Sequence, residues 1–169
     1  MSQRENIFVA TSATVREVAS WMTNHMGFGT MNSAEDTSTD IGLRRSALIS
    51  DGMIGIRIQV NTFAVPDAAS DEIQATDAYP IQIDLWAPGR TIEIQKAEGR
   101  EVFDRLVSSS PQTSALLTHD LDILVCAYLA GVGTHEFLDK TTIDIPDLER
   151  WKPWVVDSKQ PGQGLPSMS

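Results

Sequence analysis

Residues 44–60 read RRSALISDGMIGIRIQV, and this stretch decides the expected fold. Two β-type runs, 44–50 and 53–60, flank the dipeptide Asp51-Gly52. An Asp-Gly pair between such runs is a strong hairpin signal, because both central residues of a type I′ turn need a positive φ. In the second run isoleucine and valine alternate with polar residues. One face of this strand is therefore expected to be buried and the other to face water.

Two helices are expected on either side of this hairpin. Thr14 and Glu17 have the spacing of a capping box, apolar residues follow at helical spacing, and Gly27 fits the position just past the helix end. The second helix is expected over residues 97–108. Further β-type runs occupy residues 7–11, 79–86, 115–118 and 121–129. The order β-α-β-β-β-α-β-β predicts an α+β fold, an antiparallel or mixed sheet with two helices packed on one face, for which a ferredoxin-like variant is the nearest plan.

Composition and charge restrict the functional classes. The chain of 169 residues is 41% apolar, which suits one folded domain, expected over residues 1–157 and followed by a flexible tail at 158–169. The 13 basic and 23 acidic residues give a net charge of −10, so nucleic acid and anionic membranes are not expected as partners. The single cysteine, Cys126, and the absence of a signal-like apolar segment in the first residues favour a cytoplasmic location.

The negative charge is concentrated in two regions. Residues 63–86 and residues 113–150 each carry a net charge of −5, and the rest of the chain sums to zero. Such regions either keep the protein soluble or form a face that is complementary to a basic partner. Trp151 and Trp154, in the C-terminal extension, are expected to dock on their own domain. The candidate partner-binding residues are the loop acids and the outward side chains of one strand: Asp67, Asp71, Glu72, Asp77, Gln82, Asp84 and Trp86.

The segment His119-Asp120-Leu121-Asp122 is the one candidate for chemistry. A histidine beside two carboxylates can act as a general base or bind a cation, and a pocket closed by the C-terminal extension would then make a small enzyme. A polar turn between two strands explains the same residues, and we favour that interpretation. Because no two histidines have metal-ligand spacing, we expect neither a metal nor a cofactor, and we assign no catalytic residue.

Several stretches carry a resemblance to a known family. They are IFVATSATVREVA at 7–19, YPIQIDLW at 79–86, GREVF at 99–103 and ALLTHD at 115–120. Over residues 6–128 their order resembles that of small immunity proteins of bacterial polymorphic and contact-dependent toxin systems. The resemblance implies an acidic protein without a cofactor that masks the active site of a cognate basic toxin, of nuclease or NAD-degrading type. The resemblance assigns no functional residue in this sequence. The alternative binding role is that of a secretion-accessory partner, which binds another protein without inhibiting it.

Overall fold

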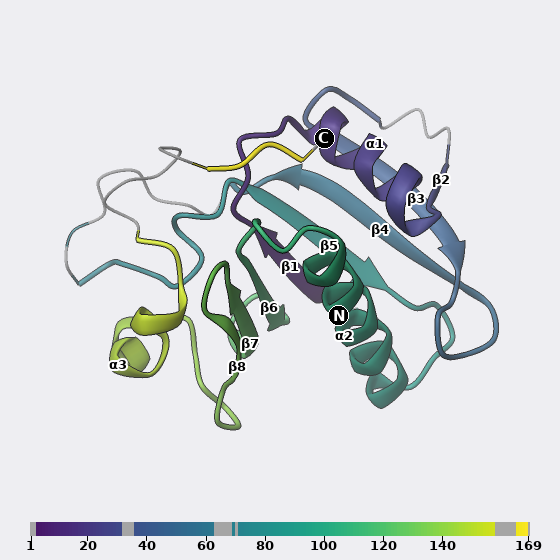
Figure 1. Cartoon of the computed structure of the whole chain (residues 1–169). Helices are drawn as coiled ribbons and strands as arrows, with labels where there is room; N and C mark the ends of the chain where they lie inside the picture. Colours follow the sequence, from purple (N-terminus) through teal and green to yellow (C-terminus); the bar gives the residue numbers. More distant parts are fainter. Residues whose placement is uncertain (1–2, 32–35, 63–68, 70, 158–164, 169) are drawn as a thin grey trace.

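The computed structural model describes residues 3–31, 36–62, 69, 71–157 and 165–168. Within these ranges the strands form one eight-stranded sheet in the order β2-β3-β4-β5-β1-β6-β7-β8 (Figure 1). The strands are β1 (Glu5–Val9), β2 (Gly29–Thr30), β3 (Asp40–Ser46), β4 (Met53–Val60), β5 (Ile81–Trp86), β6 (Ala115–His119), β7 (Ile123–Leu129) and β8 (Gly133–Glu136). Every neighbouring pair is antiparallel. The α+β class is confirmed, whereas the ferredoxin-like arrangement is not.

Two helices, α1 (Val15–Met26) and α2 (Ile92–Ser109), cover one face of the sheet (Figure 1). The capping box of Thr14 and Glu17 is present, and Gly27 ends α1 with a φ of 73°. The predicted start of the second helix at residue 97 is wrong. The side chain of Thr91 accepts a hydrogen bond from the backbone N–H of Ile94, so it caps the helix and the helix begins at Ile92.

The apolar core lies between these helices and the sheet. A continuous cluster joins the inner sides of α1 and α2 to alternate residues of β1, β3, β4, β5 and β6 and to Cys126 of β7. Its members include Val18, Met22, Val102, Phe103, Leu106, Ile7, Leu43, Ile56, Ile83 and Leu117, all buried. Gly99 brings α2 close to β1, since a Cβ atom at this position would lie 2.5 Å from Cγ of Glu5. The helices therefore cover the sheet at close range, as a single apolar layer requires.

The C-terminal extension, residues 137–157, covers part of the other face of the sheet. It contains η1 (Ile145–Asp147), α3 (Leu148–Trp151) and η2 (Lys152–Trp154), and α3 lies beside β7 and β8 in Figure 1. Trp151 is 2% exposed, and its indole N–H donates a hydrogen bond to the carbonyl oxygen of Asp144 at 3.1 Å. Trp154 stacks on His135 with ring centroids 4.2 Å apart. Both tryptophans thus dock on their own domain, as the sequence indicated.

Residues 165–168 depart from the expected flexible tail. The carbonyl oxygen of Pro166 accepts hydrogen bonds from the backbone N–H of Ser12, at 3.0 Å, and from the hydroxyl of Thr11, at 2.8 Å. Met168 is 3% exposed and belongs to the core cluster beneath the helices. The prediction of a flexible segment over 158–169 is therefore wrong for these four residues. Residues 158–164 and 169 lie outside the described ranges.

Candidate functional site

The sheet face opposite the helices divides into an apolar part and a polar part. Around Phe8 on β1, Leu116 on β6 and Ala127 on β7 it is apolar, and it is covered there by the C-terminal extension and by Tyr79. Over β5 and β4 it is polar, because Gln82, Asp84 and Trp86 point away from the helices. The predicted orientation of these side chains is correct. Their predicted exposure is wrong for two of them, since Gln82 is 1% exposed and Asp84 is 7% exposed.

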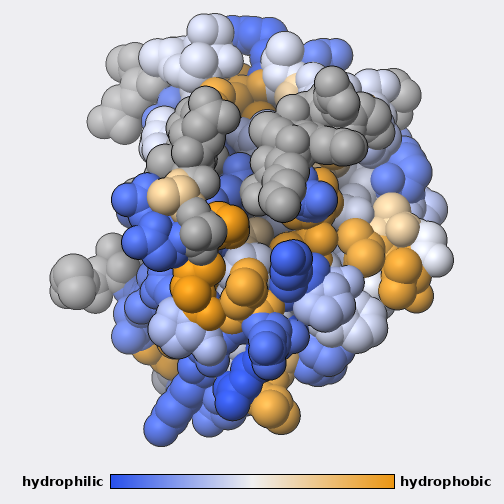
Figure 2. Space-filling view, turned by 90° about the vertical axis from the view of Figure 1, so that its left-hand side faces the viewer, coloured by the Kyte–Doolittle hydropathy of each residue, from blue (hydrophilic) through white to orange (hydrophobic). Residues whose placement is uncertain are grey.

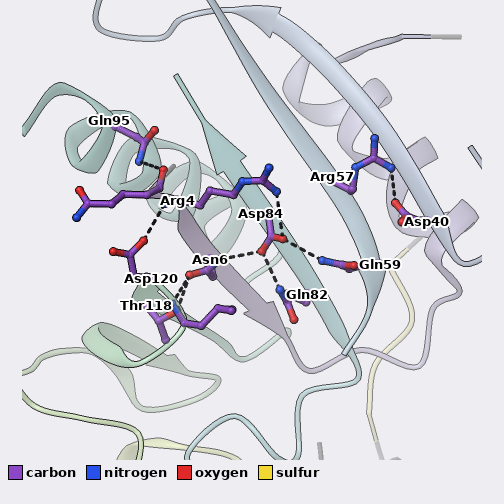
Figure 3. Close-up of polar contacts among 12 residues, drawn as sticks. Arg4, Asn6, Asp40, Arg57, Gln59, Gln82, Asp84, Gln95, Thr118 and Asp120 are labelled. Carbon is purple, nitrogen blue, oxygen red and sulfur yellow. Dashed lines mark hydrogen bonds and ion pairs between the residues drawn. The ribbon is translucent and has the colours of Figure 1, made fainter. Parts of the chain in front are cut away.

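Asp84 is the centre of a hydrogen-bonded network on this polar part (Figure 3). Its Oδ1 atom accepts hydrogen bonds from the side-chain amides of Asn6 and Gln82, both at 2.8 Å. Its Oδ2 atom accepts one from the amide of Gln59 at 2.9 Å, and the guanidinium of Arg4 lies 3.9 Å away. The strand register explains the set, because Asn6 is the direct cross-strand partner of Asp84.

These donors satisfy the carboxylate from within the chain. A buried carboxylate is stable only when it is hydrogen-bonded or paired, and three amide groups fulfil that requirement here. The negative charge of Asp84 is therefore used inside the fold and is not presented at the surface. The Oε1 atom of Gln82 is the exception in this network, since no described group donates a hydrogen bond to it.

Trp86 lies at the end of β5 beside Arg4. Its indole ring covers Gly55 on β4, where a Cβ atom would come within 2.5 Å of the ring. The guanidinium carbon of Arg4 lies 5.2 Å from the ring centroid, which is a cation–π geometry. These contacts leave Trp86 half-buried. A partner at this surface would therefore contact a ring that is already packed between Gly55 and Arg4.

The remaining predicted residues lie on the segment that precedes β5. Asp71 and Glu72 are exposed, in agreement with a contact role. Asp77 is 9% exposed, and its Oδ2 atom accepts a hydrogen bond from the backbone N–H of Gln74 at 2.9 Å. Its expected role as an outward loop acid is therefore wrong, because the carboxylate closes a local turn. Asp67 lies outside the described residues.

The two acidic regions meet in space. The backbone N–H of Ala75 donates to the carbonyl oxygen of Ile143 at 2.9 Å, and the side-chain amide of Gln74 donates to Oδ1 of Asp144 at 2.8 Å. We call the surface over residues 71–77 and 139–149 the acidic junction. Its exposed acids are Asp71, Glu72, Asp139, Asp144 and Glu149. Figure 2 views the side of the molecule that carries the C-terminal extension, where hydrophilic residues surround small apolar patches.

His119 lies between two carboxylates at the end of β6. Its Nδ1 atom is 2.6 Å from Oε2 of the buried Glu5, and its Nε2 atom is 3.6 Å from Oδ2 of Asp120. Burial raises the pKa of Glu5, against the opposing effects of the hydrogen bond and charge of His119. A general base needs one ring nitrogen directed at a substrate, whereas both nitrogens here face carboxylates of the same chain.

The segment after His119 is a polar turn between two strands, which is the interpretation that the sequence favoured. Asp120 has a φ of 51° and Leu121 a φ of 71°, and the amide of Leu121 donates to Oδ1 of Asn6 at 2.8 Å. Asp120 and Asp122 therefore do not line one face of an extended strand, because the backbone at Asp120 and Leu121 is left-handed. Asp122 is exposed in the same turn, just before β7.

Two further groups are explained by burial. Cys126 is fully buried, and burial raises the pKa of its thiol to about 12, so the reactive thiolate is scarce at neutral pH. Glu98 is also fully buried, and the backbone N–H groups of Leu48, Ile49 and Ser50 each donate to its carboxylate at 2.9 Å. Burial raises the pKa of Glu98, but these amides outweigh that effect and lower the pKa below its usual value.

Neither a metal centre nor a membrane segment is found within the described ranges. No group of three or more histidine, cysteine or acidic side chains there is placed to hold a metal ion. None of the helices in the same part of the chain combines the length and the apolar character that crossing a bilayer requires. Comparisons of the chain with protein-family models, with curated proteins and with solved structures found no match.

Proposed function

We propose that this chain is an immunity-type binding protein, which neutralises a basic protein toxin by covering the toxin's active site with the acidic junction. The observation that supports this proposal is the meeting of the two acidic regions. Residues 63–86 and 113–150 are far apart in the sequence. The Ala75–Ile143 and Gln74–Asp144 hydrogen bonds nevertheless bring residues 74–75 and 143–144 side by side, so that the exposed Asp144 lies next to the segment that carries Asp71 and Glu72.

Charge complementarity gives this surface its preferred partner. Enzymes that cleave nucleic acids or dinucleotides bind anionic substrates and therefore carry basic active sites. A surface that carries Asp71, Glu72 and Glu149 is attracted by the same field as the substrate. Because this attraction is screened over ~8–10 Å at ordinary ionic strength, association should slow as salt is added.

The acidic junction is part of the folded domain. The ring of Tyr79 is fully buried beneath it, and its hydroxyl accepts a hydrogen bond from the backbone N–H of Val156 at 3.2 Å. Trp151 is buried in the same apolar cluster as Tyr79. Acids that are held on such a scaffold lose little conformational freedom on binding, which favours affinity.

Two measurements test the proposal. The first is the growth of cells that produce the C-terminal domain of a secreted protein encoded beside this chain, with and without the chain. The second is the association rate of the two purified proteins. Asp71→Asn with Glu72→Gln should slow association by about tenfold at low salt and much less at high salt. Asp51→Asn with Glu93→Gln removes the same charge from exposed positions elsewhere and should leave the rate nearly unchanged.

The outcomes separate the parts of the proposal. Failure of the chain to protect growth contradicts the neutralising function. Binding without protection would instead indicate a secretion-accessory role. Protection together with equal association rates for the two double variants would show that the acidic junction is not the contact surface.

A further inference from the structure

A pocket of about 410 Å³ lies where β1 begins, β5 ends and α2 begins. It is lined in part by Gln3, Arg4, Trp86, Arg90, Thr91 and Gln95. In Figure 1, α2 begins at the lower right, away from the C-terminal extension at the left, so this pocket is distinct from the acidic junction. Its volume falls within the range of pockets that hold small molecules.

The charge of this pocket is opposite to that of the whole chain. Two arginines line it, and none of the lining residues that the structure describes is acidic. The other described pockets that contain arginine also contain acids. One pairs Arg45 and Arg105 with Glu101 and Asp104, and the pockets that Arg16 lines also hold an acidic side chain. In a protein of net charge −10, a pocket with two guanidinium groups and no carboxylate favours an anion.

Arg90 is fixed in position by uncharged groups. Its Nε atom donates to Oγ of Ser50 at 3.3 Å, and its NH1 atom donates to the carbonyl oxygen of Pro88 at 3.1 Å. Gly52 makes room for it, since a Cβ atom there would lie 1.8 Å from NH2 of Arg90. The hydroxyl of Ser50 in turn donates a hydrogen bond to the carboxylate of Glu98, so these hydrogen bonds connect Arg90 to that carboxylate only through Ser50. The guanidinium charge is thus held at the pocket without a direct ion pair to any residue that the structure describes.

Arg4 stands on another wall and is less tightly held. Its side chain is 43% exposed, rests on Trp86, and is 3.9 Å from the carboxylate of Asp84. Because three amides already satisfy Asp84, this long ion pair contributes little to it. The guanidinium of Arg4 can therefore turn toward a ligand at low cost. The hydroxyl of Thr91 accepts from Ile94 and still has its own proton to donate.

We propose that this pocket binds a phosphate-bearing small molecule, with Arg90 as its fixed anchor and Arg4 closing on it from the opposite wall. A guanidinium presents a planar fork of N–H donors that matches phosphate oxygens, and a phosphate offers more oxygens than a carboxylate for two such forks and a hydroxyl. The inference does not depend on the proposed toxin-binding role, since it rests on other residues on another side of the molecule.

Titration of the full chain with inorganic pyrophosphate, followed by calorimetry and by amide shifts in NMR, tests this site. We expect saturable binding that perturbs the amides of residues 86–92. Arg90→Gln and Arg4→Gln should each weaken it by about tenfold, which is typical for the loss of one charged hydrogen-bonding partner. Arg16→Gln removes an arginine from pockets that contain acids and should change the affinity by less than about twofold.

A second variant keeps the test decisive if a substitution of Arg90 disturbs the fold. Gln3→Glu places a carboxylate at the exposed rim without removing a side chain that holds the pocket, and it should also weaken pyrophosphate binding several-fold. The proposal is overturned by the absence of saturable binding at ~5 mM pyrophosphate. It is equally overturned if Arg16→Gln weakens binding as much as Arg90→Gln, or if Gln3→Glu leaves binding unchanged.

Discussion

The two faces of the sheet are stabilised by different kinds of contact. On the helix side, α1 and α2 bury one continuous apolar cluster. On the other side, the C-terminal extension covers an apolar part, and the part over β4 and β5 is held by the amides around Asp84. Apolar burial is non-directional and scales with area, whereas a hydrogen-bonded network requires each donor to meet its own acceptor. The same strands therefore carry one face that tolerates substitutions of similar volume and one that depends on individual polar atoms.

The largest expected effect is on the helix side. Phe103 is fully buried in the cluster, so Phe103→Ala should lower the free energy of unfolding by about 3–5 kcal/mol. Trp154→Ala removes a half-buried ring that stacks on His135 and should cost only about 1 kcal/mol. Urea denaturation of both variants measures the difference. Equal losses would show that the C-terminal extension contributes as much to global stability as the helices do.

The polar network is tested by removing its acceptor. Asp84→Ala removes the acceptor of the buried side-chain N–H groups of Asn6 and Gln82 and should cost about 1–3 kcal/mol in the free energy of unfolding. Arg44→Ala, at an exposed position on β3, should change the stability by less than about 0.5 kcal/mol and serves as the control. If Asp84→Ala is as neutral as the control, the network is not a source of stability.

Two buried glutamates, Glu98 on α2 and Glu5 on β1 beneath this helix, should give opposite pH dependences. The pKa of Glu98 is lowered in the fold, so its contribution is complete above its unfolded pKa of ~4.3 and is lost as the pH falls through the folded pKa. The pKa of Glu5 is raised, so its contribution is present below ~4.3 and is lost as the pH rises through the folded pKa.

Unfolding free energies measured from pH 3 to pH 6 should separate the two. Glu98→Gln should flatten the decline on the acid side, and Glu5→Gln should flatten the decline on the other side. A pH profile that neither substitution alters would contradict the hydrogen-bond assignments at both sites.

The smallest expected effect is at the acidic junction. Asp71 and Glu72 are exposed, and Asp71→Asn with Glu72→Gln should change the free energy of unfolding by less than about 0.5 kcal/mol. Thermal unfolding at low and high salt measures it. A larger loss would mean that these acids hold the fold together, and the slowed association predicted for this variant would then have a structural cause.

The parts of the fold that could be predicted are those with local causes. The capping box of Thr14 and the left-handed cap at Gly27 each need particular residue types within a few positions. A hairpin at this point was predicted correctly, but its two-residue turn at Asp51-Gly52 was wrong: β3 ends at Ser46, residues 47–52 make the connection, and of the pair Asp51-Gly52 only Gly52 has a positive φ. The α+β class followed from the order of these elements. The start of α2 was missed because its first turn, with Ile92 and Ile94, has the alternating pattern of a strand. The capping residue Thr91 was a better indication of where the helix begins than this alternation.

The parts that could not be predicted depend on contacts between distant residues. Alternation gave the direction of Gln82 and Asp84 but not their burial, nor the hydrogen bonds that Asp84 accepts from Asn6 and Gln59 on neighbouring strands. Arg4 and Arg90 line the same pocket although they are far apart in the sequence, and no sequence pattern near either residue predicts this pocket. The meeting of the two acidic regions likewise depends on tertiary hydrogen bonds.

The position of β1 has a consequence for how the chain folds as it is made. β1 lies between β5 and β6, and its hydrogen-bonding partners are residues 81–85 and 115–119. The ribosome makes this strand before both of its neighbours, which emerge only several seconds later at ~5–20 residues per second. During that interval the unpaired strand Glu5–Val9 has no native partner and is a natural target for a chaperone. Folding of the sheet should accordingly be slow, because its central pairings join distant segments.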